Sequence, residues 1–170
     1  ADWQWQAARQ PAPCLESGAP EFDHAPTAYL DVYPPADMSE KAMAHDLAHH
    51  DNRYAWIGDT LKQTAARFGW EAVTFGEIRD LNRHRTGAKY CPLIPLGFYA
   101  AQDQLRDGHA AYRRLAGIGR DASARARALL VEGDPSYLYW TLLGTQYRFE
   151  HLTTADKFIY EAELRTGTGA

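Results

Sequence analysis

The chain has 170 residues, a formal net charge of -4 and a sequence pI near 6.0. This length and a hydrophobic content of 45% are typical of one globular domain with a core. The acidic balance argues against a dedicated nucleic-acid or membrane-surface binder, and no apolar run is long enough to span a membrane. Two cysteines outside any metal-ligand spacing favour a reducing cytoplasm.

Residues 1–37 are predicted to form a proline-rich arm or an interdomain linker, since six of the nine prolines fall there. The only strand candidate in this stretch is Tyr29 to Tyr33. Residues 38–170 then form the predicted folded domain. The chain starts at Ala1 without a methionine, and we expect it to be a fragment of a longer, tandem protein.

A long helix is predicted next, starting with the capping residue Ser39 and ending at Phe68, with Gly69 as its stop. Alternation from Trp70 to Ile78 predicts a strand that leads into the segment from Arg79 to Arg85.

Two prolines between Cys91 and Leu96 predict a rigid loop. Helical spacing then indicates a helix from Phe98 to Gly117 and another over residues 121–131, which the turn at residues 133–135 ends. An aromatic run over residues 137–143 predicts a strand, and residues 155–165 predict a closing helix capped by Thr154. Without regular alternation of strands and helices, the predicted class is α+β, a mixed sheet flanked by helices.

Arg83-His84-Arg85 carries the clearest functional signal. These groups, with Arg79 one turn earlier, suit a phosphate or diphosphate better than a hydrophobic core. The alternative is an exposed basic strand end that pairs with acidic neighbours. The aromatic residues near 137–149 could stack on a flavin or base, but core packing is the ordinary explanation.

His45 and His49 share a helix face and could supply two ligands of a metal site, with aspartates nearby. No glutamate follows His45 as a metalloprotease helix requires, and histidines at this spacing are usually surface residues. We therefore predict no metal.

The order of parts from about Val73 to Arg165 resembles that of the flavin-dependent thymidylate synthases. That family carries an Arg-His-Arg motif after a strand, then an Ala-Arg-x-x-Leu segment, and a closing helix with Ala-Gln-x-Glu-Ile-Arg. The similar segments here are Arg83-His84-Arg85, Ala126-Arg127-Ala128-Leu129-Leu130 and Tyr160-Glu161-Ala162-Glu163-Leu164-Arg165, where Glu161 takes the place of the glutamine.

The resemblance implies reductive methylation of dUMP to dTMP, with FAD supplying the hydride and methylenetetrahydrofolate the one-carbon unit. It places Arg83, His84 and Arg85 at the flavin and Arg127 at the nucleotide. No nucleophile from the protein is required, so no catalytic residue is assigned. It also implies a homo-oligomer or a pair with a second copy of the fold, because family members share each site between subunits.

The departures from the family pattern fall on its polar positions. Ala88, Tyr90, Leu143 and Thr145 stand where the family has serine, asparagine, asparagine and arginine. Losing a charge-assisted contact costs about 1.5–3 kcal/mol. We therefore predict a degenerate module that contributes to a composite site; the alternative is a non-catalytic domain that pairs with an intact copy.

Overall fold

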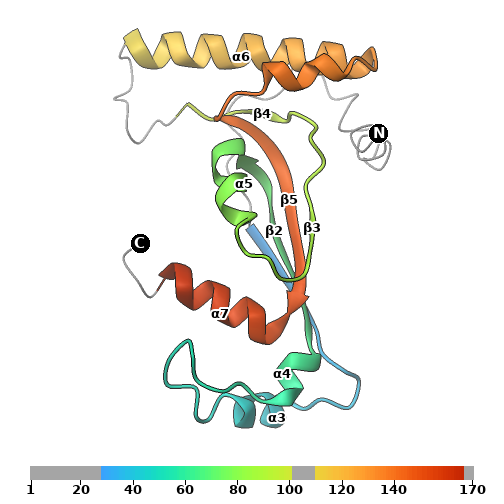
Figure 1. Ribbon diagram of the computed structural model, residues 1–170, viewed down its shortest axis with the longest axis vertical. Helices are drawn as coiled ribbons and strands as arrows, with labels where there is room; N and C mark the ends of the chain where they lie inside the picture. The colour runs from blue at the N-terminus through green and yellow to red at the C-terminus, as the bar shows by residue number, and fades with distance from the viewer. Residues whose placement is uncertain (1–27, 101–109, 167–170) are drawn as a thin grey trace. The chain divides into compact units, whose positions relative to one another are not determined.

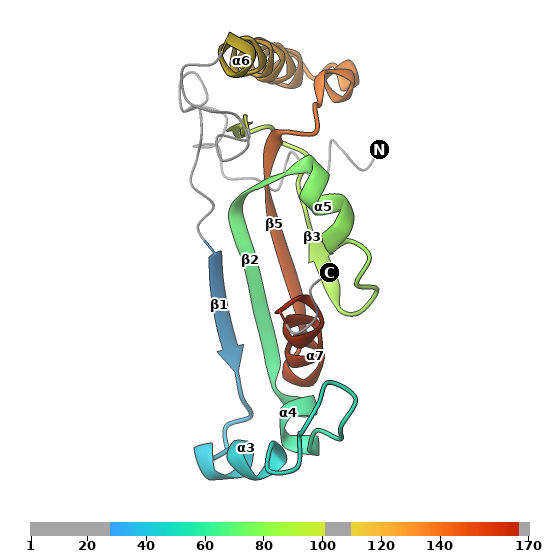
Figure 2. The same ribbon diagram turned by 90° about the vertical axis from the view of Figure 1, so that its left-hand side faces the viewer.

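The computed structural model describes residues 28–100 and 110–166. Both of these ranges contribute strands to a sheet (Figures 1 and 2). Within these residues the sheet has five strands. Their order is β1 (Ala28–Tyr33), β2 (Ala65–Thr74), β5 (Thr145–Thr154) and β3 (Ala88–Tyr90). The short strand β4 (Gly97–Phe98) pairs antiparallel with β5, with Gly97 opposite Gln146. A sheet flanked by helices confirms the predicted α+β class.

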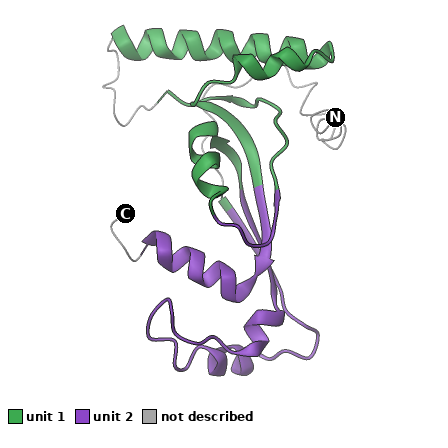
Figure 3. Ribbon diagram, viewed as in Figure 1, with its two compact units in different colours: residues 1–28, 70–83, 90–149 green, residues 29–69, 84–89, 150–170 purple. Residues whose placement is uncertain are grey.

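The chain divides into two compact units (Figure 3). Among the described residues, unit 1 holds 28, 70–83, 90–100 and 110–149, and unit 2 holds 29–69, 84–89 and 150–166. Strands β2 and β5 are each long enough, at ten residues, to contribute to both units.

In unit 1, α5 (Phe75–Leu81) covers one apolar cluster, in which Ile78 meets Val73, Tyr147 and Phe149. The long helix α6 (Ala110–Val131) packs against the 3-10 helix η1 (Pro135–Trp140) and against β4. These contacts bury a second cluster that includes Leu129 and Tyr137.

In unit 2, two short helices, α3 (Glu40–Asp46) and α4 (Asp59–Gln63), pack on each other, and α4 packs on α7 (Ala155–Thr166). Leu61 and Ile159 share one apolar cluster there. The Phe68 ring on β2 lies 4.9 Å from that of Phe158 on α7, measured between centroids. Helix α7 is thereby fixed on the sheet of its own unit.

The predicted helix from Ser39 to Phe68 is wrong in its extent. Ser39 does cap a helix, accepting from the amide of Ala42, but α3 ends at Asp46. The Asn52 side chain accepts from the amide of Tyr54 at 3.0 Å, a local turn that competes with helix. Asp46 is buried and accepts from the amide of Leu61, so its carboxylate joins the two short helices.

The predicted strand from Trp70 to Ile78 holds only as far as Thr74. At Thr74 the chain turns into α5 through a capping box, in which Thr74 accepts from the amide of Glu77 and the Glu77 carboxylate accepts from the amide of Thr74. Thr74 followed by Glu77 three residues later is a sequence signal for a helix start, but the alternating pattern of this stretch favoured a strand.

Two further predictions in unit 1 are wrong. The run over residues 137–143 is not a strand, because Asp134 and Pro135 start the 3-10 helix η1. Helix α6 passes through Gly117 without a break, and Phe98 lies in β4 rather than in a helix.

Several predictions are confirmed: the strand at residues 29–33 as β1, the helix end at Gly133, the loop before Gly97, and the closing helix as α7. Most of the predicted arm, residues 1–27, and residues 101–109 lie outside the described residues. The boundary at residue 37 therefore stays a prediction, although β1 contributes a strand to the sheet. No helix among the described residues is long and apolar enough to cross a membrane.

Candidate functional site

Arg83-His84-Arg85 follows helix α5, not a strand as predicted. The Arg83 side chain is 71% exposed, and its Nε lies 3.4 Å from Asp80 Oδ1. Arg83 therefore has an acidic neighbour, as expected if the segment were only an exposed basic stretch that pairs with acidic residues. Arg85 is exposed, whereas the His84 side chain is only 11% exposed. The three residues therefore differ: two present guanidinium groups at the surface, and the histidine between them turns inward.

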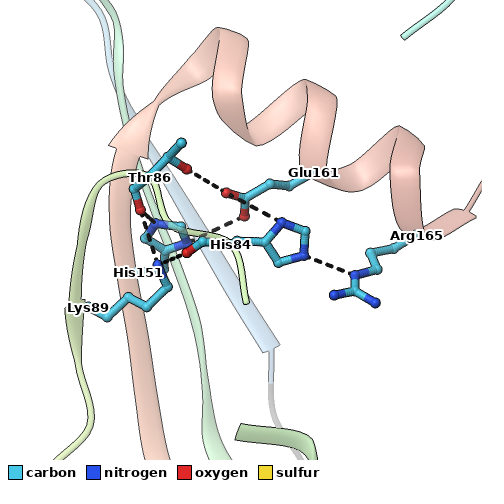
Figure 4. Close-up of polar contacts among 6 residues, drawn as sticks. All are labelled: His84, Thr86, Lys89, His151, Glu161 and Arg165. Carbon is cyan, nitrogen blue, oxygen red and sulfur yellow. Dashed lines mark hydrogen bonds and ion pairs between the residues drawn. The ribbon is translucent and has the colours of Figure 1, made fainter. Parts of the chain in front are cut away.

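The loop after His84 is held by side chains of β5 and α7 in unit 2 (Figure 4). Thr86 Oγ1 donates to Glu161 Oε1 at 2.9 Å, and His151 Nε2 lies 2.6 Å from the carbonyl oxygen of Thr86. The His151 and Glu161 side chains are 2% and 9% exposed. A buried carboxylate and a buried imidazole thus hold one residue of the loop by its side chain and its backbone.

Gly87 allows the loop to approach this closely. Its φ is +67°, a backbone conformation that favours glycine, and a Cβ there would lie 2.2 Å from the carbonyl oxygen of Leu152. Any side chain at this position would push the loop away from β5.

Glu161 accepts from several donors at once. Burial acts to raise the pKa of its carboxyl, but hydrogen bonds from His151 and Thr86 and the charges of His151 and His84 outweigh burial, so the pKa lies below its ordinary value of 4.5. A carboxylate is therefore the stable form of this buried group at neutral pH.

His84 is held as a neutral base. Burial is the main reason that the pKa of His84 lies below its ordinary value of 6.5; Glu161 acts in the opposite direction, while Arg165, Lys89 and His151 lower it further. Arg165 Nε donates to His84 Nε2 at 2.9 Å, and Lys89 donates to the His84 carbonyl oxygen. Side chain and backbone of His84 are both bound by cationic groups.

Arg127, the residue implied for the nucleotide, is half-buried on α6 in unit 1. Of the aromatic residues considered for stacking, Tyr137, Tyr147 and Phe149 are buried in the core, as the ordinary explanation has it, but the Tyr139 side chain on η1 is 90% exposed.

The four residues that depart from the family pattern lie in different surroundings. Ala88 and Tyr90 lie in β3, and Leu143 is exposed. Thr145 is fully buried at the start of β5, and its hydroxyl accepts from the amide of Leu142 at 2.9 Å. Burial of Cys91 raises the pKa of its thiol to about 12, so it is not a nucleophile at neutral pH.

His45 and His49 are both exposed, and the residues that the structure describes hold no group of three metal-ligating side chains. The neighbouring His50 instead binds the two oxygens of Glu163 on α7, at 2.9 and 3.0 Å.

His151 had no predicted functional role. The signal that could have found it is the alternation from Thr145 to Thr154, where every second residue is buried and His151 shares the buried face with Phe149. A histidine on the buried face of a strand indicates a buried polar contact.

Comparison with solved structures identifies the fold. The chain is similar to the UMP/dUMP methylase PolB from Streptomyces cacaoi, solved with 5-Br UMP, with a TM-score of 0.56 and 15% identity over 86% of this chain and 79% of that one. It is also similar to the flavin-dependent thymidylate synthase ThyX from Helicobacter pylori, complexed with FAD and dUMP, with a TM-score of 0.52 and 13% identity over 80% and 73% of the two chains. No family model and no curated protein matches the sequence. The chain has the flavin-dependent thymidylate synthase fold, which confirms the sequence resemblance at the level of the fold.

Proposed function

We propose that the chain is a flavin-dependent thymidylate synthase-like module, related to the reductive methylation of dUMP to dTMP with FAD and methylenetetrahydrofolate. Its own site is partly degenerate, and it contributes the segment Arg83-His84-Arg85 to a composite site that a second copy of the fold completes.

The observation that carries the proposal is the combination of this fold with an exposed arginine pair on an anchored loop. Arg83 and Arg85 are exposed on either side of a histidine that the protein interior holds. A loop fixed in this way can present its guanidinium groups to a diphosphate without first being ordered, which lowers the entropic cost of binding.

Each residue then has a role. Arg83 and Arg85 bind the flavin diphosphate, His84 fixes the segment between them, and Arg127 binds the nucleotide phosphate. Bound flavin and folate supply the hydride and the one-carbon unit. The protein contributes orientation and charge.

Two residues, Thr145 and Leu143, support the proposal that the site is degenerate. Thr145 is buried with its hydroxyl in use, and Leu143 offers no polar group, so neither can bind a flavin as an arginine or an asparagine does. The remaining contacts have to come from elsewhere, and sites shared between subunits are a general way to provide them.

The flavin absorption spectrum of the purified 170-residue chain tests the proposal. We expect flavin absorbance after purification or after reconstitution with FAD, at a protein concentration at which light scattering shows self-association. A colourless protein at that concentration would contradict the proposal.

The second candidate is a non-catalytic domain that pairs with an intact copy of the fold. The buried, satisfied Thr145 favours it, since this position has become structural. It predicts binding to an intact flavin-dependent thymidylate synthase-like subunit without flavin absorbance of its own, and a monomer that binds no such subunit would contradict it.

A further inference from the structure

The segment that carries the two exposed arginines is held by a buried polar network whose hydrogen positions can be deduced. The network links Thr86 and Lys89 of the loop and β3 to His151 on β5 and Glu161 on α7 (Figure 4). All of its members lie in unit 2.

One proton has to lie between His151 and Glu161. The carbonyl oxygen of Thr86 can only accept, so His151 Nε2, 2.6 Å away, carries a hydrogen and donates. His151 Nδ1 then faces Glu161 Oε2 at 3.4 Å. Without a proton between them, a lone pair would face a carboxylate oxygen in a buried site, which is repulsive. With one, the contact is an ion pair or a hydrogen bond.

His84 has the complementary tautomer. Arg165 can only donate, so His84 Nε2 accepts, and the hydrogen of the neutral ring lies on Nδ1. That atom is 3.9 Å from Glu161 Oε1, the oxygen that also accepts from Thr86. Glu161 therefore faces hydrogens from β5, from the loop and from the histidine between the arginines.

We propose that Glu161 and His151 are positioning residues, which hold the segment Arg83-His84-Arg85 in place through their hydrogen bonds to Thr86 and their contact with each other. The charged and titratable groups that face this pair are His84 from the loop, Arg165 from α7 and Lys89 from β3. The purpose given to the segment rests on the proposed function, but the anchoring itself does not require a ligand.

Glu161→Gln removes the charge of Glu161 but can keep its hydrogen bonds. The amide oxygen of a glutamine still accepts from Thr86, and its NH2 group donates to the unprotonated Nδ1 of His151. This substitution also introduces the residue that the resembling family carries at the position. Glu161→Ala removes every contact.

The experiment is amide hydrogen exchange of residues 84–89 in the full chain without ligand, with helix α4 of the same unit as internal reference. We expect exchange at residues 84–89 to be about 10- to 100-fold faster in Glu161→Ala, the effect of losing hydrogen bonds to a buried charge. In Glu161→Gln it should stay close to the original rate. If Glu161→Ala does not fold, Thr86→Val, which removes one donor, should show about 10-fold faster exchange.

A conservative variant of His151 separates a specific hydrogen bond from simple packing. His151→Gln, whose amide still donates to Thr86, should keep more protection of residues 84–89 than His151→Leu, which cannot donate.

Two results would overturn the inference. One is exchange at residues 84–89 that Glu161→Ala and Thr86→Val leave unchanged; the other is a Glu161→Gln chain in which residues 84–89 exchange as fast as in Glu161→Ala. Because no flavin is present, these results are independent of whether the proposed function holds, which flavin absorbance decides separately.

Discussion

His84 and Glu161 give the protein a defined acid sensitivity. Each has a pKa that is lower in the folded chain than in the unfolded one, so the unfolded chain binds more protons as the pH falls. The contribution of His84 to the free energy of unfolding is complete above pH 6.5 and is lost as the pH falls through its lowered pKa. That of Glu161 is complete above pH 4.5 and is lost below it.

Urea unfolding over a pH series checks this prediction. His84→Gln should remove the loss of stability that begins below pH 6.5, because the titrating group is gone. His49→Gln, an exposed histidine in the same unit, should leave that loss in place. Equal profiles for the two variants would contradict the assignment to His84.

Gly87 should tolerate no side chain. Gly87→Ala combines a positive φ with a Cβ 2.2 Å from the carbonyl oxygen of Leu152, and we expect it to lower the free energy of unfolding by about 2–4 kcal/mol. Gly133→Ala is the matched control, because Gly133 also has a positive φ but open space around it; its cost should be about 1–2 kcal/mol. Urea denaturation measures both, and equal costs would show that the close approach to Leu152 is unimportant.

Helix α6 contains two glycines, Gly117 and Gly119, at which substitution by alanine should change stability in opposite directions. A Cβ at Gly119 would lie 2.2 Å from the Phe98 ring, so Gly119→Ala should destabilise unit 1. Gly117 has nothing within 4 Å, so Gly117→Ala should stabilise the helix by about 0.5–1 kcal/mol. Thermal unfolding followed by circular dichroism gives the sign of each change, and destabilisation by Gly117→Ala would contradict an uninterrupted α6.

The elements that sequence could predict are those bounded by local chemistry. Ser39, Gly133 and the closing helix follow capping and turn rules, which act over a few residues. Residues 65–68 contain good helix formers, yet they belong to β2, because sheet pairing and burial of Ala66 and Phe68 override intrinsic preference.

The candidate site also has a part that the local sequence indicates and a part that depends on tertiary structure. Arg83-His84-Arg85 is visible in the sequence as a short motif, and both of its arginines are exposed; its role at the flavin stays a prediction. His151 and Glu161 act together only because β5 and α7 bring residues ten positions apart to 3.4 Å. A contact of this kind depends on tertiary structure, and only the strand pattern around His151 indicated that it is buried.

For the whole molecule, the fold and the site lead to different conclusions. The fold is that of flavin-dependent thymidylate synthases over most of the chain, whereas Thr145, expected to be an arginine in that family, is buried and satisfied. The proposed degenerate module, which works beside another copy of the fold, rests on this contrast.

Titration of FAD into the 170-residue chain, followed by flavin absorbance and fluorescence, tests the central claim most directly. We predict saturable binding that Arg85→Ala weakens by about 10- to 100-fold, the effect of one lost charge-assisted contact, while Arg114→Ala, an exposed arginine on α6, leaves it unchanged. No binding at concentrations at which the chain self-associates, or equal binding by the two variants, would contradict a flavin role for the segment Arg83-His84-Arg85.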